Sequence, residues 1–220
     1  EYLLAKTEIV AEEIQQEEDN YVAALEWGES NGADVVNSSL GYLDWYSYCD
    51  MDGNTAITTI GVDIAASLGL VCVTSAGNWA NEDPPEDPCE SLSYYISAPA
   101  DADSVIAVGA VSADSLIVYF SSRGPSYDGR IKPEVSALGV NVAAANPAGG
   151  YSVFYSGTSA SSPLVAGAAA VLLSANPQWT NMEIREALMM TASQADIPNN
   201  DYGYGLVNIW SALFYNYSGS

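Results

Sequence analysis

Small hydroxyl residues gather on a glycine turn at residues 155–167, directly ahead of an apolar run. Gly157 permits backbone conformations that other residues avoid, so the turn can place Ser159 at the N-terminus of the helix that follows. Unpaired backbone N–H groups and the positive end of the helix dipole gather at that point. They could stabilise the negative charge that develops when a serine oxygen attacks a carbonyl group. Ser159 is therefore the predicted nucleophile.

A purely structural explanation of the same residues stands beside the catalytic one. Thr158 or Ser159 could simply cap the helix, with Pro163 in its first turn. Asn78 could be a turn residue that ends the apolar run 70–75, because Gly-Asn pairs are common in turns. In the catalytic interpretation, Asn78 instead supplies a side-chain amide that stabilises the oxyanion. Either motif alone leaves both explanations open.

Residues 157–167, Gly-Thr-Ser-Ala-Ser-Ser-Pro-Leu-Val-Ala-Gly, resemble the nucleophile motif of the subtilisin-like serine peptidases. The usual motif reads Gly-Thr-Ser, then small residues, then Pro-His-Val-Ala-Gly. Leu164 replaces that His, which in the family is a packing position and not the catalytic base. Residues 34–41 resemble the family's substrate-pairing strand, and residues 75–78 resemble its oxyanion segment, in the expected order.

The resemblance implies a serine endopeptidase that cleaves a protein or peptide substrate through an acyl-enzyme. Further matches at residues 120–125, 128–135 and 203–208 carry no catalytic group and support only the fold. The implied catalytic residues are Ser159, as nucleophile, and Asn78, in the oxyanion hole. The implied substrate-binding residues are Ser39, Leu40, Gly41, Ala76 and Gly77.

The general base is missing from the sequence. The chain has no histidine, so Ser159 cannot be activated from within by a Ser-His-Asp arrangement. In the family, the Asp and the His precede the strand with which this chain begins. We therefore expect residues 1–215 to be the C-terminal portion of a catalytic domain, with residues 216–220 as a tail. The chain on its own should be nearly inactive.

Two alternatives remain open. Sedolisin-type peptidases use a similar serine turn with Glu and Asp in place of His, although their oxyanion position is an Asp where this chain has Asn78. The second alternative is a catalytically inactive peptidase fold retained as a binding module. Labelling of Ser159 by a fluorophosphonate would separate a peptidase from a binding module.

The order of predicted elements indicates an α/β protein. Helices and apolar strands alternate along the chain, and this order of elements is typical of a parallel sheet with crossover helices. We predict a three-layer subtilisin-like fold, a mainly parallel sheet flanked by helices, with its N-terminal segment missing. The predicted strands are residues 2–7, 34–41, 70–75 and 104–111. The predicted helices are residues 20–30, with Val22, Leu25 and Trp27 facing inward, and residues 55–68, 164–174 and 181–191.

Composition limits the partners. The net charge is −23, from 5 basic and 28 acidic residues, so binding to nucleic acid or to an anionic membrane is not expected. The apolar helix at 164–174 is shorter than the ~20 residues needed to cross a bilayer. An acidic surface fits a secreted or extracellular protein, and we expect a monomer.

No cofactor is expected, and the sequence leaves calcium binding open. Residues 50–54 resemble the start of an EF-hand loop, but Thr55 and Gly61 occupy the positions that require Gly and Glu, so a turn is predicted. Cys72 lies in an apolar run and is predicted to be buried. By resemblance, Cys49 and Cys89 are neighbours at the cleft and could pair in an oxidising compartment. The resemblance also suggests a cis Ala98–Pro99 bond.

Overall fold

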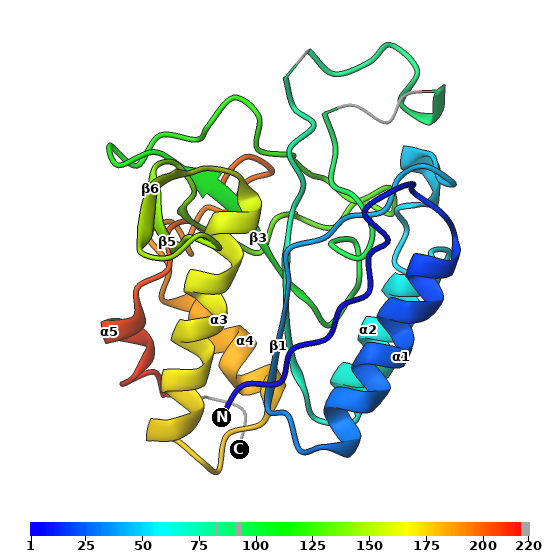
Figure 1. Cartoon of the computed structure of the whole chain (residues 1–220). Helices are drawn as coiled ribbons and strands as arrows, with labels where there is room; N and C mark the ends of the chain where they lie inside the picture. The colour runs from blue at the N-terminus through cyan, green and yellow to red at the C-terminus, as the bar shows by residue number, and fades with distance from the viewer. Residues whose placement is uncertain (82, 91–93, 217–220) are drawn as a thin grey trace.

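The computed structural model describes residues 1–81, 83–90 and 94–216. Its centre is a sheet of four parallel strands in the order β1-β2-β3-β4 (Figure 1). These strands are β1 (Val35–Ser38), β2 (Val71–Ser75), β3 (Ile106–Val111) and β4 (Val135–Leu138). A separate antiparallel pair, β5 (Val142–Ala145) and β6 (Tyr151–Tyr155), leads into the serine turn.

Helices cover both faces of the parallel sheet (Figure 1). Successive side chains of a strand point to opposite faces, and β2 shows the result. Cys72 packs in the core beneath α1 and α2, whereas Val71 and Val73 pack in the core beneath α3 and α4. The predicted three-layer α/β fold is confirmed. The helices are α1 (Gln16–Ser30), α2 (Ile57–Ser67), α3 (Thr158–Ala175), α4 (Asn181–Met190) and the short α5 (Ile209–Ala212), with 3-10 turns η1 (Tyr48–Asp50) and η2 (Pro88–Glu90).

Two glycines explain how α2 fits between its neighbours. Gly61 faces α1, and a Cβ at this position would lie only 2.9 Å from a methyl group of Val22. The missing side chain lets the two helices approach closely. Gly69 follows α2 with φ 107°, a left-handed conformation that ends the helix and turns the chain into β2.

The prediction for residues 2–7 is wrong. This apolar segment forms no strand, and Tyr2 and Leu4 are 95% and 89% exposed. A strand needs a hydrogen-bonded neighbour and a layer over its apolar side chains, and here the segment has neither. Only Thr7 is buried, and its carbonyl accepts a hydrogen bond from Asn20 Nδ2. Trp27, predicted to face inward, is also exposed.

The helix α3 is the core helix behind the serine turn. Its 18 residues, with a mean hydropathy of 1.4, would suffice by length and composition alone to cross a membrane. Half of the helix is buried inside the fold, where it packs on β1, β2 and β3. This burial is typical of the core helix of a folded domain.

The sequence left open whether Cys49 and Cys89 pair, and in the structure they form a disulfide with their Cα atoms 5.2 Å apart. Cys72, in β2, is a buried free thiol, as predicted. The Ala98–Pro99 bond is cis. The predicted turn is present, because Asp52 accepts hydrogen bonds from the backbone N–H groups of the next residues.

Candidate active site

Ser159 lies in the first turn of α3, after a sharp bend at Gly157. Gly157 is the N-cap residue and has φ 146°, and no side chain caps the helix. The Ser159 hydroxyl instead donates a hydrogen bond to the Ser39 carbonyl, at 3.3 Å. Because Ser159 is only half-buried, its hydroxyl is not sealed in the core. The structural explanation of this serine as a helix cap is therefore wrong.

The side chain of Asn78 is held in one orientation by Thr158. Its Oδ1 accepts hydrogen bonds from the Thr158 backbone N–H at 2.8 Å and from the Thr158 hydroxyl at 3.1 Å. The same hydroxyl accepts a hydrogen bond from the Gly77 N–H at 3.2 Å. A backbone N–H can only donate, so these contacts fix which end of the amide faces Thr158. The Nδ2 group points away and has no partner among the described residues.

The Asn78 amide and the start of α3 lie around one point. A Cβ built on Gly157 would be 3.6 Å from Asn78 Nδ2 and 3.6 Å from the Ser159 backbone nitrogen. The Ser159 N–H belongs to the first turn of α3, where backbone donors lack helical partners. The Asn78 amide and the Ser159 backbone nitrogen therefore both lie beside Gly157, on the turn that carries the Ser159 hydroxyl. Such an arrangement can accept a carbonyl oxygen that becomes negatively charged during attack.

The five predicted substrate-binding residues lie at the same edge of the sheet. Ser38 at the end of β1 pairs with Thr74 of β2 in parallel, so the residues that follow each strand run side by side. Across this pair, the Ser75 hydroxyl donates to the Leu40 carbonyl at 3.2 Å. The structure thus brings together all seven predicted site residues at the carboxyl ends of parallel strands, where α/β proteins commonly bind ligands. The residues concerned are Ser39, Leu40, Gly41, Ala76, Gly77, Asn78 and Ser159.

Sequence reasoning missed two supporting residues, Thr158 and Ser122. Ser122 lies in the segment 120–125, to which only a role in the fold was assigned. Its backbone N–H donates to the Gly77 carbonyl at 2.9 Å, and its hydroxyl accepts from the Trp79 N–H at 3.0 Å. A Cβ on Gly77 would lie 2.8 Å from the Ser122 hydroxyl, so this turn requires glycine. Ser122 therefore supports the loop that carries Asn78.

No titratable side chain within the described residues bonds to Ser159, whose hydroxyl contacts only a backbone carbonyl. The position of the family's packing His holds Leu164, which is 45% exposed. Burial of the Cys72 thiol raises its pKa to about 12, so this cysteine is not a nucleophile. The chemistry of the site therefore rests on Ser159.

Two other features lie apart from these residues. The carboxylates of Glu8, Glu13 and Glu17 approach within 4.8 Å of one another, a spacing that could hold a metal ion. Burial, followed by the charge of Glu17, raises the pKa of Glu13.

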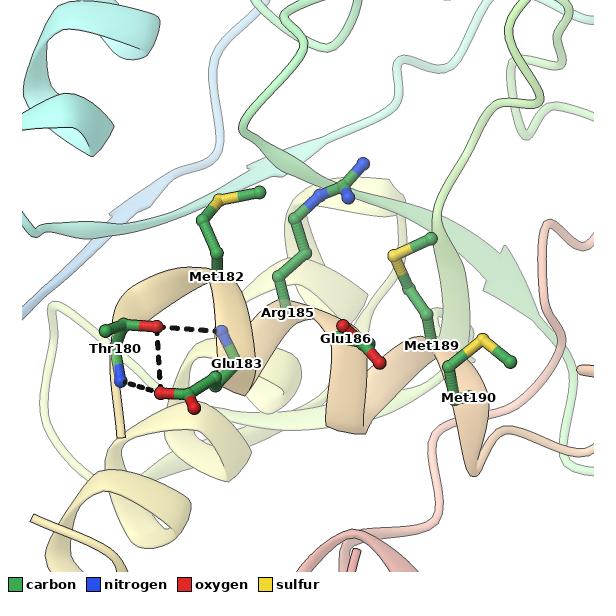
Figure 2. A pocket seen from close by; sticks show the side chains of 7 residues that line it. All are labelled: Thr180, Met182, Glu183, Arg185, Glu186, Met189 and Met190. Atoms are coloured by element: carbon green, nitrogen blue, oxygen red, sulfur yellow. Dashed lines mark hydrogen bonds between the residues drawn. The ribbon is translucent and has the colours of Figure 1, made fainter. Parts of the chain in front are cut away.

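A pocket of about 480 Å³ runs along α4 and contains none of the seven site residues (Figure 2). Its lining residues are Thr180, Met182, Glu183, Arg185, Glu186, Met189 and Met190.

A serine at a helix N-terminus, facing an oriented amide at the carboxyl edge of a parallel sheet, has the form of the nucleophile site of a serine hydrolase. The model of the subtilase family matches residues 6–205. The chain therefore belongs to the subtilase family of serine peptidases.

Individual relatives agree with this assignment. The chain is 38% identical over 192 residues to subtilisin amylosacchariticus of Bacillus subtilis subsp. amylosacchariticus, covering 87% of this chain and 44% of that protein. It is 39% identical over 191 residues to a subtilisin of Bacillus pumilus, covering 87% of this chain and 60% of that protein. The chain thus spans about half the length of the curated relatives it matches.

Solved structures show the same fold. The self-cleaved protease domain of PatA superposes with a TM-score of 0.70 at 25% identity, covering 89% of this chain and 66% of that one. The prenylagaramide maturation protease PagA superposes with a TM-score of 0.71 at 25% identity, covering 92% of this chain and 68% of that one.

Proposed function

We propose that this chain supplies the nucleophile and the oxyanion donors of a serine endopeptidase. Ser159 Oγ attacks the carbonyl carbon of a peptide bond while its proton passes to a general base. The carbonyl oxygen becomes an oxyanion that accepts hydrogen bonds from Asn78 Nδ2 and the Ser159 N–H. Collapse of this intermediate breaks the C–N bond, the base protonates the leaving amine, and an acyl-enzyme remains on Ser159 until water hydrolyses it.

The observation that carries this proposal is the orientation of the Asn78 amide. Oδ1 accepts two hydrogen bonds from Thr158, so Nδ2 is held on the side away from Thr158, beside the turn at Gly157, before any substrate arrives. A donor fixed in advance does not need to reorganise during the reaction, which is the basis of oxyanion stabilisation. The same two hydrogen bonds satisfy the buried Thr158, so they stabilise the fold as well as fix the amide.

The general base is proposed to be a histidine, oriented by an aspartate, from polypeptide outside residues 1–220. The chain contains no histidine. Among the described residues, β1 pairs only with β2 in the sheet, so its other edge can accept a further strand. Ser159 contacts Ser39, directly after β1, so a segment paired with that edge could reach the nucleophile. Residues 1–220 alone are therefore proposed to hydrolyse peptides very slowly.

The proposed substrates are proteins or peptides bound in extended form. Residues 39–41 follow β1 at this edge of the sheet and are proposed to pair with an extended chain. Ala76 and Gly77 are proposed to contact the substrate in another way, because their backbone groups bond within the fold. The net charge of −23 argues against nucleic acid as a partner. The Cys49–Cys89 disulfide supports a secreted or extracellular location, because reducing cytosol does not preserve such bonds. A monomer needing no cofactor is proposed.

Two alternatives are less well supported. The subtilase match and Asn78 at the oxyanion position both speak against a sedolisin-type peptidase. An inactive binding module would explain the contacts between Asn78 and Thr158 through stability alone, but it would not explain a half-buried serine beside an Nδ2 donor that has no partner among the described residues.

Fluorophosphonate labelling tests the proposal. The full-length product of the gene and the isolated chain 1–220 would each be treated with the reagent, and adducts would be located by mass spectrometry. We expect rapid labelling of Ser159 in the full-length product, none in its Ser159→Ala variant, and very slow labelling of the isolated chain. A folded full-length product that leaves Ser159 unlabelled would favour the binding module.

A further inference from the structure

We propose that Ser39 is a positioning residue for the nucleophile, because its hydroxyl replaces the backbone donor that Pro163 removes from the Ser159 carbonyl. This inference rests on the proposed function of Ser159. It gives the Ser39 side chain a role distinct from the pairing of its backbone with substrate.

The need for such a donor follows from the sequence of α3. In an α-helix, the N–H of each residue bonds to the carbonyl four residues earlier. Residue 163 should therefore donate to the carbonyl of residue 159, but Pro163 lies inside α3 and has no N–H. The helix therefore lacks the regular backbone donor to the carbonyl of its own nucleophile, and a donor from another element can take that place.

The Ser39 hydroxyl is that donor. It hydrogen-bonds the Ser159 carbonyl at 3.0 Å, and the Ser159 hydroxyl returns a hydrogen bond to the Ser39 carbonyl at 3.3 Å. The two residues are 120 positions apart in sequence and are thus joined by a reciprocal pair of bonds. One bond fixes the backbone of Ser159 and the other directs its side chain. The position and the orientation of the nucleophile therefore both depend on the residue that follows β1.

A second contact orients the Ser39 hydroxyl. Asn37, two residues earlier on β1, donates from Nδ2 to the Ser39 hydroxyl at 3.4 Å. Its Oδ1 accepts a hydrogen bond from the Ser162 hydroxyl of α3 at 2.8 Å. With its lone pair facing Asn37, the Ser39 hydroxyl turns its hydrogen toward the Ser159 carbonyl. The contacts form a closed ring between β1 and the first turns of α3.

The proposal predicts how substitutions combine. Ser39→Ala removes the donor and should lower the rate of acylation about tenfold, within the ~10²-fold that a 1 Å misplacement can cause. Pro163→Ala restores an N–H that can donate to the same carbonyl. In the double variant, Ser39→Ala with Pro163→Ala, most of the lost rate should therefore return. Ser38→Ala is the matched control, because this neighbouring hydroxyl lies on the opposite face of β1.

The experiment measures the rate of fluorophosphonate acylation of the full-length gene product over a range of reagent concentrations. It gives two quantities, the maximal rate and the reagent concentration at which the rate is half of this maximum. We expect Ser39→Ala to lower the maximal rate and leave the half-saturating concentration within about twofold. A Ser39→Ala variant as fast as wild type would overturn the proposal. So would a double variant as slow as Ser39→Ala.

Hydrogen exchange of peptides covering residues 158–165 provides a readout that does not require activity. Exchange in this segment should increase in Ser39→Ala, return toward wild type in the double variant, and stay unchanged in Ser38→Ala. Unchanged exchange in Ser39→Ala would overturn the positioning role. If wild type fails to acylate yet shows this exchange pattern, the proposed function fails while the anchoring of Ser159 by Ser39 stands.

Discussion

Replacing Asn78 with aspartate should separate its catalytic role from its structural one. Aspartate has the shape of asparagine and keeps an acceptor oxygen for the two hydrogen bonds from Thr158, at 2.8 Å and 3.1 Å. It replaces the Nδ2 donor with a second acceptor. The Asn78→Asp variant therefore preserves the contacts that stabilise the fold and loses the one that would stabilise an oxyanion.

The Asn78→Asp substitution should affect stability and turnover differently. A carboxylate near the N-terminus of α3 gains about 0.3–1 kcal/mol from the helix dipole, so the free energy of unfolding at neutral pH should be unchanged or slightly higher. Turnover should fall at least 10²- to 10³-fold, which is the range known for removal of the oxyanion asparagine of subtilisin. In the Asn78→Ala control, the buried Thr158 also loses its acceptor, which should lower stability by about 1–3 kcal/mol.

The assay combines urea unfolding with hydrolysis of a chromogenic peptide by the full-length gene product. The reasoning predicts that Asn78→Asp and Asn78→Ala are similarly slow but differ clearly in stability. It would be refuted by an Asn78→Asp variant that retains turnover within about threefold of wild type. Equal loss of stability in the two variants would refute the proposed clamp.

Three further predictions concern the rest of the site and the core. In the folded chain 1–220 with its disulfide intact, no thiol should react with Ellman's reagent, because Cys72 is buried and burial raises its pKa to about 12. Denaturation should expose that one thiol, and reduction should add Cys49 and Cys89. Burial raises the pKa of Asp101, despite its hydrogen bonds. Any advantage of wild type over the Asp101→Asn variant in unfolding free energy should therefore be largest at low pH, where Asp101 is protonated. That difference in urea unfolding free energy should shrink as the pH rises above the ordinary pKa of an aspartate and through the raised folded-state pKa. Gly157→Ala should cost about 1–3 kcal/mol in thermal or urea unfolding through backbone strain at φ 146°, because a Cβ there meets no atom closer than 3.6 Å.

Much of the fold could be predicted because its apolar runs are long and regular. The strand predicted at residues 70–75 is the fully buried β2, and the helix predicted at 181–191 is α4 with one residue fewer. Residues 2–7 show the limit of this reasoning. Apolar composition predicts a strand only if another strand is present to pair with it, and the pairing partner of a segment is not encoded within the segment.

The members of the candidate site could be proposed from the sequence, but the contacts between them could not. Ser159 and Asn78 could be found from motif and chemistry, since each motif is a short contiguous stretch. The clamp on Asn78 joins residues 80 positions apart, and the pair between Ser39 and Ser159 joins residues 120 apart. Several neighbouring hydroxyls could make such a contact. The one that does is determined by the register of the sheet and the angle at which α3 packs on it, and both depend on residues far apart in the sequence.

The most direct test of the central claim is a crystal structure of the full-length gene product carrying a phosphonate adduct on Ser159. The account predicts that one phosphonyl oxygen lies about 2.7–3.1 Å from both Asn78 Nδ2 and the Ser159 backbone nitrogen. An adduct whose oxygens all point away from the Asn78 amide would contradict it.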